Sequence, residues 1–410
     1  MKGILVILDG IGGLPCKQIG EKTPLDVADM PNLDFLSARG KLGYMYPVKP
    51  GFVPESDEAI VSIFGNKLIS STRGQLEARG TNIKLTRGDL ALRVNFATVD
   101  SKNILDRRAG RTLTTEEAQI LAKALNKIKL PCKFIFEPTI QHRAVLVFRG
   151  GLSDNISGND STYISGKSKN ENKIGFCKPL DDDENSQYTS NVVNEFIEKA
   201  YEILDKHPVN KERKRKGLLP ANYLLVRGAG IEVPKLKLYK KWISANYMPL
   251  EIGFSKVSGM KNFSFDYPKL KNLDAYKNLY DGLEKACKVT IKILKKHCQD
   301  SDYAYIHFKE TDLPGHDNKP LEKKLMLELI DKTFFRFLRK FVTKNKIKVV
   351  VTADHSTPCK LKAHSADPVP VLFYNDSVPK EKKFCEKQAR TGSLGRIMGN
   401  ELLKKVGFVK

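Results

Sequence analysis

Short apolar runs alternate with longer amphipathic segments along this chain of 410 residues, and several apolar runs stop at an acidic residue or a histidine. The runs at 3–8 (GILVIL), 303–308 (YAYIHF) and 349–351 (VVV) have the length and composition of buried strands. Segments 275–298 and 322–342 repeat apolar residues at helical spacing, which predicts amphipathic helices. Strands that alternate with helices are typical of an α/β fold.

The texture changes between about 73 and 240, where no comparable set of aspartates and histidines occurs. The pattern there predicts, in order, a strand at 88–99, a helix at 113–130, a strand at 144–148, a long polar loop at 150–187, a helix at 190–205 and a strand at 222–226. The densest basic run, KERKRK at 211–216, is typical of a solvated loop. Elsewhere we expect helical structure over 23–40 and a closing helix at about 390–405, and residues 369–374 form another apolar run.

One strand end offers the strongest candidates for metal binding. Asp354 and His355 follow the apolar run at 349–351, and His364 lies nine residues after His355, across a polar loop. Carboxylate and neutral imidazole are common ligands of divalent ions, and the end of a strand holds them in place. The alternative is a turn that contains an ordinary Asp-His pair.

Further candidates lie at other predicted element ends. Asp9 follows the first strand, although an Asp-Gly pair also fits a plain turn. The D-x-x-x-H spacing of Asp312 and His316 places both side chains on one face of a helical turn. Ser56 precedes a helical segment, where a hydroxyl is usually a cap but where the helix N-terminus also favours a phosphoryl group.

Together these residues predict one metal-binding domain built from both ends of the chain, 1–72 and 240–410, with a second domain, 73–239, inserted between them. Seven oxygen and nitrogen ligands fit two ions better than one, and two cations beside a serine hydroxyl suit phosphoryl transfer. The seven residues are Asp9, Ser56, Asp312, His316, Asp354, His355 and His364.

The inserted segment contributes an arginine cluster, DRRAGR, at 106–111. Arg107, Arg108 and Arg111 lie within one or two helical turns of each other, and guanidinium groups bind carboxylate and phosphate through paired hydrogen bonds. The alternative is a solvated charge cluster.

Composition narrows the class of protein. Hydrophobic residues make up 41% and charged residues 29% of the chain, as in a soluble globular protein. Seven scattered cysteines without a C-x-x-C pair indicate a reduced, cytoplasmic setting with no disulfide framework and no structural zinc cluster. The apolar N-terminal run is too short for a signal peptide or a membrane span, so we expect neither.

The chain carries 70 Lys and Arg against 47 Asp and Glu, a formal net charge of +23. These basic residues are spread along the chain without the basic-aromatic motif of a nucleic-acid-binding module, so we expect no nucleic-acid partner. A positive field attracts small anionic substrates, and richness in Lys and Glu is also a feature of thermophilic proteins. The sequence leaves the oligomeric state open.

Six ordered motifs carry a resemblance to a known family: LDGIGG, PESDEAIVSIFG, NFATV with DRRAGR, PANYLLVRGAG, TDLPGHDN and TADHSTPCKLKAHSADPVP. In that order they resemble the archaeal-type cofactor-independent phosphoglycerate mutases of the alkaline phosphatase superfamily. The resemblance covers nearly the whole chain. It implies a mostly parallel sheet with helices on both faces and a smaller inserted α/β domain. It also implies interconversion of 3-phosphoglycerate and 2-phosphoglycerate with two divalent ions (Mn, Zn, Co or Mg) and without bisphosphoglycerate.

The resemblance assigns roles to individual residues. Those that match the family's ligands for one ion are Asp9, Ser56, Asp354 and His355. Those that match the ligands for the other ion are Asp312, His316 and His364. Ser56 would attack the substrate phosphorus and become phosphoserine, while the inserted domain holds the glycerate and closes to exclude water. The candidates for this glycerate clamp are Arg107, Arg108, Arg111, Arg143 and Arg227.

Four departures from the family pattern concern the substrate side. Glu55 replaces a glycine before the nucleophile, Ile60 replaces a histidine four residues after it, and the DTDP-type segment is GNDS at 158–161. Ile252 stands near a usual lysine, for which Lys256 is a candidate substitute. Glu55 would either repel a phosphoserine or point away from it. Two alternatives stay open: a metal-dependent phosphatase or mutase for another phosphorylated metabolite, and a weakened paralogue that binds metal without turnover.

Overall fold

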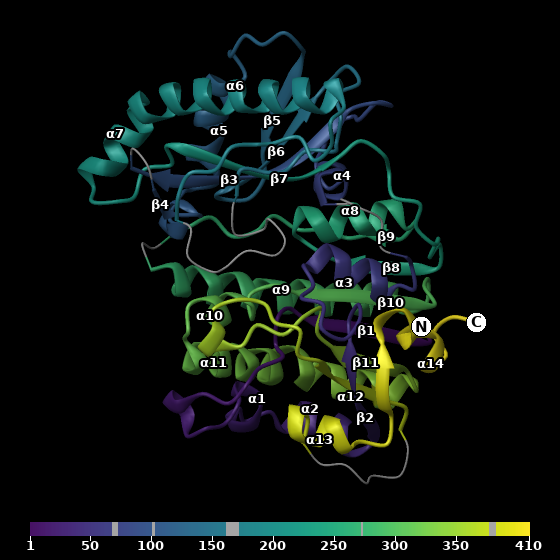
Figure 1. Ribbon diagram of the computed structural model, residues 1–410. Coiled ribbons are helices and arrows are strands. Elements are labelled where there is room, and N and C mark those ends of the chain that lie inside the picture. The colour runs from purple at the N-terminus through teal and green to yellow at the C-terminus, as the bar shows by residue number, and fades with distance from the viewer. Residues whose placement is uncertain (68–72, 101–102, 161–171, 272–273, 377–382) are drawn as a thin grey trace.

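The computed structural model describes residues 1–67, 73–100, 103–160, 172–271, 274–376 and 383–410. Their buried hydrophobic side chains form two main cores, each built on its own sheet (Figure 1). One core contains residues from both ends of the chain, and the other contains residues between Leu90 and Ala229. The predicted boundaries, 1–72 with 240–410 and 73–239, stay a prediction, and residues 68–72 lie outside the described residues.

Within the described residues, eight strands form the larger sheet, and five of its seven neighbouring pairs are parallel. The two antiparallel pairings are those of β12 with its neighbours. The predicted α/β class with a mostly parallel sheet is therefore confirmed. In sheet order the strands are β13 (Gly395–Met398), β2 (Gly40–Tyr46), β12 (Val369–Tyr374), β11 (Lys348–Thr352), β1 (Gly3–Leu8), β10 (Tyr303–Phe308), β8 (Trp242–Ala245) and β9 (Lys261–Asn262).

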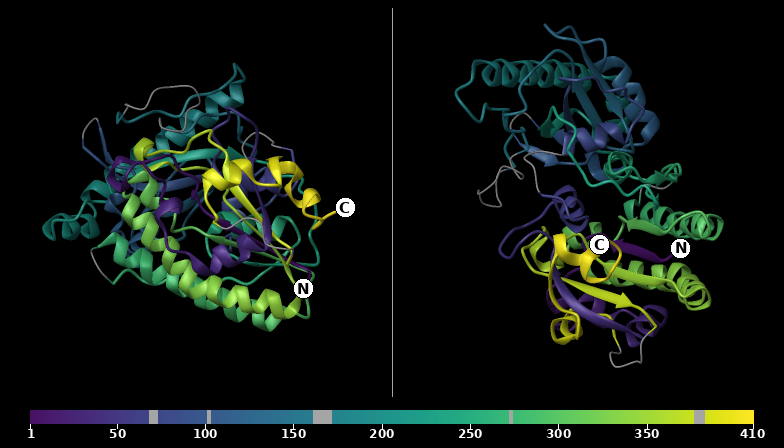
Figure 2. Two further views of the ribbon diagram at one scale, coloured as in Figure 1. Left: turned by 90° about the horizontal axis from the view of Figure 1, so that it is seen from below. Right: turned by 90° about the vertical axis from the view of Figure 1, so that its right-hand side faces the viewer.

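Helices pack around this sheet (Figure 2). The longest is α9, whose N-cap Asp274 accepts hydrogen bonds from the amides of Tyr276 and Lys277. The helices are α1 (Pro24–Val27), α2 (Pro31–Ala38), α3 (Ser56–Ile63), α8 (Pro249–Val257), α9 (Ala275–His297), α10 (Leu313–His316), α11 (Pro320–Ile330), α12 (Arg336–Asn345), α13 (Glu386–Thr391) and α14 (Leu402–Lys405).

The smaller sheet is antiparallel throughout and is organised around its longest strand, β3, which is buried along its whole length. Helices α5 and α6 lie over it in Figure 1. Its strands are β3 (Leu90–Val99), β4 (Ile104–Asp106), β5 (Phe134–Pro138), β6 (Arg143–Phe148) and β7 (Tyr223–Gly230). Its helices are α5 (Thr115–Leu125), α6 (Glu184–Lys206) and α7 (Pro208–Arg215).

Helix α4 (Arg73–Arg79) lies between the two sheets. It packs on α8, a helix of the larger sheet, and on β3 and β7, strands of the smaller sheet. The approach to α8 is close: a Cβ added to Gly253 would lie 1.7 Å from the carbonyl oxygen of Leu76. Only a residue without a side chain permits this contact. The glycine therefore fixes α4, and with it Arg73, against the larger sheet's helices.

Three predicted elements are wrong in kind or extent. The basic run at 211–216 falls mostly on α7, because a proline at its first turn and the His207 ring, which accepts from the Val209 amide, start a helix there. The predicted loop 150–187 ends early, at α6, where Asp183 caps the helix. The expected closing helix at 390–405 is interrupted by β13, which begins at Gly395 with a φ of 68°.

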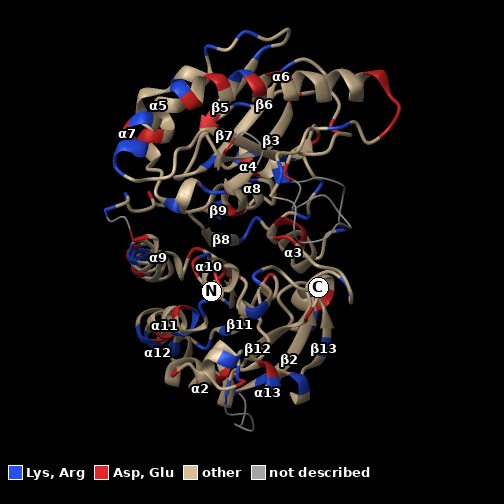
Figure 3. Cartoon of the chain, turned by 60° about the vertical axis from the view of Figure 1, so that its left-hand side comes forward, with Lys and Arg blue, Asp and Glu red and all other residues tan. Residues whose placement is uncertain are grey.

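Other differences are smaller. The helical segment predicted over 23–40 is two short helices, and Gly40 opens the unpredicted strand β2. The helix predicted at 322–342 runs from Pro320 to Asn345 through a wider π-helical turn at Asp331–Phe335. Among the described helices, none combines the length and the apolar character needed to cross a membrane. Basic and acidic residues are interspersed over both parts of the molecule (Figure 3).

Candidate active site

Three parallel strands bring residues from distant parts of the chain to one sheet edge. The register pairs Ile7 of β1 with His307 of β10 and with Thr352 of β11. The residues that follow these strands, Asp9, Lys309 and Asp354, therefore lie together at the carboxyl edge, where open α/β sheets bind ligands. Asp9 and Asp354 are buried.

Ser56 is the first residue of α3 and lies at this same edge, with Glu55 rather than Ser56 as the N-cap. Its Oγ lies 3.4 Å from Nε2 of His355 and accepts from Nζ of Lys309 at 3.4 Å. The other end of α3 is anchored by Phe64, whose ring lies 5.0–5.6 Å from four aromatic rings. The helix thus presents a buried hydroxyl beside a histidine and a lysine.

The first predicted ligand group is brought together. Nε2 of His355 lies 3.2 Å from Oδ1 of Asp9 and 3.4 Å from Oδ2 of Asp354. Two donors bound to one ion at about 2.1 Å lie roughly 3 Å apart, so this spacing suits a shared cation. Both of these carboxylate oxygens are buried and have no hydrogen-bond partner among the described residues. An orphaned buried oxygen costs stability, and a bound cation would satisfy it.

The second predicted group also converges. Nε2 of His316 lies 3.2 Å from Oδ2 of Asp312, and Nε2 of His364 lies 3.8 Å from Oδ1 of Asp312. The other ring nitrogen of each histidine faces a backbone carbonyl: His316 that of Lys362, and His364 that of Pro54, at 3.2 and 3.0 Å. Such partners fix the ring and leave Nε2 free to bind an ion. The donor chemistry of both groups therefore fits divalent metal ions.

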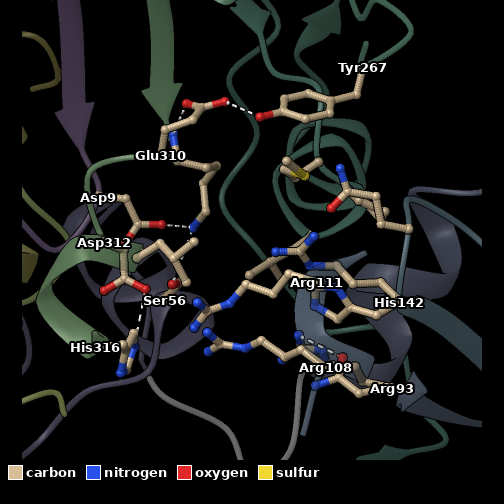
Figure 4. Close-up of a pocket in the computed structure, with 18 of the residues that line it drawn as sticks. Asp9, Ser56, Arg93, Arg108, Arg111, His142, Tyr267, Glu310, Asp312 and His316 are labelled. Atoms are coloured by element: carbon tan, nitrogen blue, oxygen red, sulfur yellow. Dashed lines mark hydrogen bonds and ion pairs between the residues drawn. The ribbon is translucent and has the colours of Figure 1, made fainter. Parts of the chain in front are cut away.

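Asp9, Ser56 and Asp312 lie on one side of the pocket in Figure 4, and the sequence did not predict the cation that pairs with this acidic edge, Lys309. Its Nζ forms an ion pair with Asp9 and lies 3.0 Å from Oε1 of Glu251 and 4.0 Å from Oδ2 of Asp354. Burial opposes the charge on Lys309, but these carboxylates outweigh burial and raise its pKa. Burial likewise opposes ionisation of Asp9, yet Lys309, His307 and His355 hold its pKa well below the usual value. The signal for Lys309 was its position directly after the apolar run 303–308.

The opposite wall of the pocket is basic. Of the predicted clamp, Arg108, Arg111, Arg143 and Arg227 line the pocket, whereas Arg107 does not and instead pairs with Asp160. Two arginines that the sequence did not predict also line the pocket: Arg73 of α4 and Arg93 of β3. They come from segments with no motif of their own, so only the fold reveals them.

Part of this wall has no counter-ion within the described part of the chain. Among the described residues, no carboxylate lies within ion-pair distance of Arg108 or Arg143, and His142 beside them has no hydrogen-bond partner on either ring nitrogen. Burial and the nearby charges of Arg143 and Arg108 hold the pKa of His142 well below its usual value. Two guanidinium groups and a neutral imidazole around one pocket form a site for a carboxylate or phosphate.

Comparison with known proteins identifies the family. The family model described as 2,3-bisphosphoglycerate-independent phosphoglycerate mutase matches residues 37–210. The mutases of this name from Thermococcus kodakarensis and Pyrococcus furiosus are each 40% identical to the chain, over 98% of it and 95% of their own length. The chain belongs to the 2,3-bisphosphoglycerate-independent phosphoglycerate mutase family.

Solved structures agree with this assignment to the phosphoglycerate mutase family. A protein from Pyrococcus horikoshii matches with a TM-score of 0.73 and 30% identity, covering 100% of this chain and 98% of its own. The cofactor-independent phosphoglycerate mutase from Thermoplasma acidophilum matches with a TM-score of 0.55 and 30% identity, covering 100% and 99%.

Within the mutase family, the departures noted in the sequence have definite positions. Ile60 is buried in the larger core. Lys256 is directed away from the pocket and donates to the carbonyl oxygens of Arg79 and Thr81 at 3.0 and 3.4 Å, so the structure does not bring this proposed substitute to the site. In segment 158–161, Asn159 donates to the Leu224 carbonyl, and position 161 lies outside the described residues.

The Glu55 side chain lines the pocket and is paired with basic residues. Its Oε2 accepts from Nη1 of Arg73 and from Nη1 of Arg227, both at 3.2 Å, and its Oε1 lies 3.6 Å from Nδ1 of His364. Burial opposes its ionisation, but Arg227, His364 and Arg73 outweigh burial and hold the pKa of Glu55 far below its ordinary value. Glu55 is therefore a carboxylate bound to two arginines, one residue from Ser56.

Proposed function

We propose that this chain interconverts 3-phosphoglycerate and 2-phosphoglycerate through a phosphoserine at Ser56, without bisphosphoglycerate. The observation that carries the proposal is the position of Ser56: its hydroxyl lies beside His355 of the donor set and lines the same pocket as the arginines. The names of the 40% identical relatives support the same reaction. The substrate is a small phosphorylated acid, and the seven free cysteines support a cytoplasmic location.

The metal assignment is part of this proposal. The ligands proposed for one ion are Asp9, Ser56, Asp354 and His355. Those proposed for the other are Asp312, His316 and His364. Bound at these positions, divalent ions lower the pKa of the serine hydroxyl and neutralise the phosphoryl oxygens. Oxygen and nitrogen ligands accept Mn, Zn, Co or Mg, so the donor set does not select one of them.

The reacting groups of the chain have definite tasks. In the first half-reaction, Oγ of Ser56 forms a bond to phosphorus while the bond between phosphorus and the substrate oxygen breaks. The serine proton is finally held by the departing oxygen, so charge and atoms balance. Lys309, whose Nζ already donates to Oγ of Ser56, stabilises the negative charge of the transferring group. In the second half-reaction, the other hydroxyl oxygen of the glycerate forms a bond to phosphorus, the bond between phosphorus and Oγ of Ser56 breaks, and the proton of that hydroxyl is finally held by Oγ.

The basic wall holds the glycerate between these steps. Arg108, Arg143 and His142 offer donors that no carboxylate of the described residues pairs with, and they come from the segment proposed as an inserted clamp domain, 73–239. We propose that the two parts of the molecule close over the substrate, which keeps water from the phosphoserine. An open site would act as a phosphatase.

The decisive test is an enolase-coupled assay with 3-phosphoglycerate, run with and without chelator and with and without added bisphosphoglycerate. We expect turnover that the chelator abolishes and that bisphosphoglycerate does not change. Ser56→Ala should lose mutase activity by at least about a thousandfold, whereas Ser62→Ala, a buried serine on the same helix, should keep it. Activity in Ser56→Ala, or turnover that survives the chelator, would refute the mechanism. Release of inorganic phosphate in place of isomerisation would favour the phosphatase alternative.

A further inference from the structure

Glu55 occupies an anion-binding position within the pocket. Its carboxylate receives one hydrogen bond from each of two guanidinium groups, Arg73 and Arg227, and all three side chains line the same pocket as Ser56. Paired guanidinium groups beside a nucleophile are the arrangement that binds a phosphoryl or carboxylate group of a substrate. A carboxylate of the chain itself fills that arrangement here.

The arginine on one side of Glu55 is held in place by other residues. Arg73 also donates to Oε1 of Glu77 at 2.9 Å and to Oδ1 of Asp57 at 3.1 Å, and Glu77 lies one turn further along the same helix. These two carboxylates keep the guanidinium group in the pocket wall without help from Glu55. Glu55 is therefore not needed to orient Arg73, and its carboxylate occupies both Arg73 and Arg227.

We infer that Glu55 is a resident competitor for the substrate's anionic group, and thereby sets how tightly the pocket binds phosphorylated acids. When substrate enters, its anion and the Glu55 carboxylate compete for Arg73 and Arg227, while Arg108 and Arg143 stay available throughout. The position of Glu55 next to Ser56 makes this competition local to the phosphoryl-accepting end of the pocket. This inference rests on the proposed function only for the identity of the substrate.

Binding of a simple anion tests the inference without reference to turnover. Isothermal titration of the manganese-loaded protein with sodium sulfate gives the dissociation constant for wild type, Glu55→Gln and Glu55→Gly. Gln keeps the shape and removes the charge, and Gly removes the side chain. We expect both variants to bind sulfate about tenfold more tightly, since the carboxylate that competes for Arg73 and Arg227 is lost. In the mutase assay, KM for 3-phosphoglycerate should fall in both variants, as the dissociation constant for sulfate does, and kcat should change less.

Two controls separate this effect from a general change in charge. Glu212→Gln, on the exposed surface of α7, removes an equal charge far from the pocket and should leave sulfate binding unchanged. In an Arg227→Gln background, Glu55→Gln should tighten sulfate binding much less, because one of the two competed groups is gone. Sulfate binding that is unchanged or weaker in both Glu55 variants, with melting curves that show them folded, would overturn the inference. If wild type turns over neither phosphoglycerate, the proposed function fails, and the sulfate titration still decides the role of Glu55.

Discussion

Arg111 and Asp317 join the two sides of the pocket through two parallel hydrogen bonds, of 2.5 and 2.8 Å. Arg111 belongs to the segment that carries the smaller sheet, and Asp317 directly follows the candidate metal ligand His316. The hydroxyl of Tyr276 donates to the same carboxylate at 2.8 Å. A bidentate pair of this kind fixes orientation as well as distance. It therefore links the position of the basic wall to that of the donor set.

The first prediction concerns this pair. Asp317→Asn keeps the shape of the side chain but removes the charge, so the two sides should separate more readily and admit water. We expect kcat/KM for isomerisation to fall about tenfold, and the ratio of inorganic phosphate released to 2-phosphoglycerate formed to rise. Parallel enolase-coupled and phosphate-release assays measure both. Asp302→Asn, in an ion pair with Lys2 away from the pocket, is the control. A variant that isomerises normally and releases no phosphate would contradict the coupling.

The second prediction concerns Lys309 as the cation of the acidic edge. Lys309→Met removes the charge that faces Asp9 and Glu251, and breaking a buried ion pair costs about 3–5 kcal/mol. In chelator, we expect the unfolding free energy to fall by roughly that amount. Adding manganese should raise the melting temperature of Lys309→Met by more than it raises that of wild type. Lys324→Met, in a more exposed pair with Glu328, should behave as wild type. An equal loss with and without manganese would assign Lys309 a packing role only.

Strand ends were the part of the site that the sequence could predict. Asp9 and Asp354 each follow a short apolar run, and the parallel register places such residues at one edge. Lys309 occupies the equivalent place after β10, but a lysine is not a metal ligand, so the pattern of candidate ligands does not include it. Arg73 could not be predicted, because its position depends on the glycine contact between α4 and α8.

Fold prediction failed where local signals were weakest. The strand β13 has four residues and interrupts what reads as a closing helix, and its pairing with β2 is a contact between segments about 350 residues apart. The run at 211–216 is so strongly basic that its charge masked the helix start at Pro208. The ordered motifs of the family, by contrast, let the sequence propose a nucleophile and two donor groups, because the residues proposed lie in short continuous segments.

The third prediction tests the contact that places Arg73. Gly253→Ala adds a methyl group that meets the Leu76 carbonyl oxygen, and overpacking of this kind costs about 1–3 kcal/mol even though alanine favours a helix. We expect lower stability in urea denaturation, and a raised KM for phosphoglycerate because α4 shifts. Gly253→Ser should have a larger effect in both measurements. A Gly253→Ala protein as stable as wild type would show that α4 and α8 separate without cost.

The fourth prediction follows from Glu386, which receives hydrogen bonds from the Gly13 amide and the Thr23 hydroxyl and ties the N-terminal loop to α13. Burial raises the pKa of this carboxyl to about 7, above its value of about 4.3 in an unfolded chain. Between these values the folded protein holds a proton that the unfolded chain has lost, so the contribution to stability is full below about pH 4 and is lost as the pH rises through 7. Because solvent screens this half-buried group, we expect a loss of about 1–2 kcal/mol between pH 5 and pH 8.

The Glu386→Gln variant tests this expectation, because its side chain cannot titrate. Its free energy of unfolding, measured by denaturation at both pH values, should change by about 1–2 kcal/mol less than that of wild type. Equal pH dependence in the two proteins would show that Glu386 is ionised throughout.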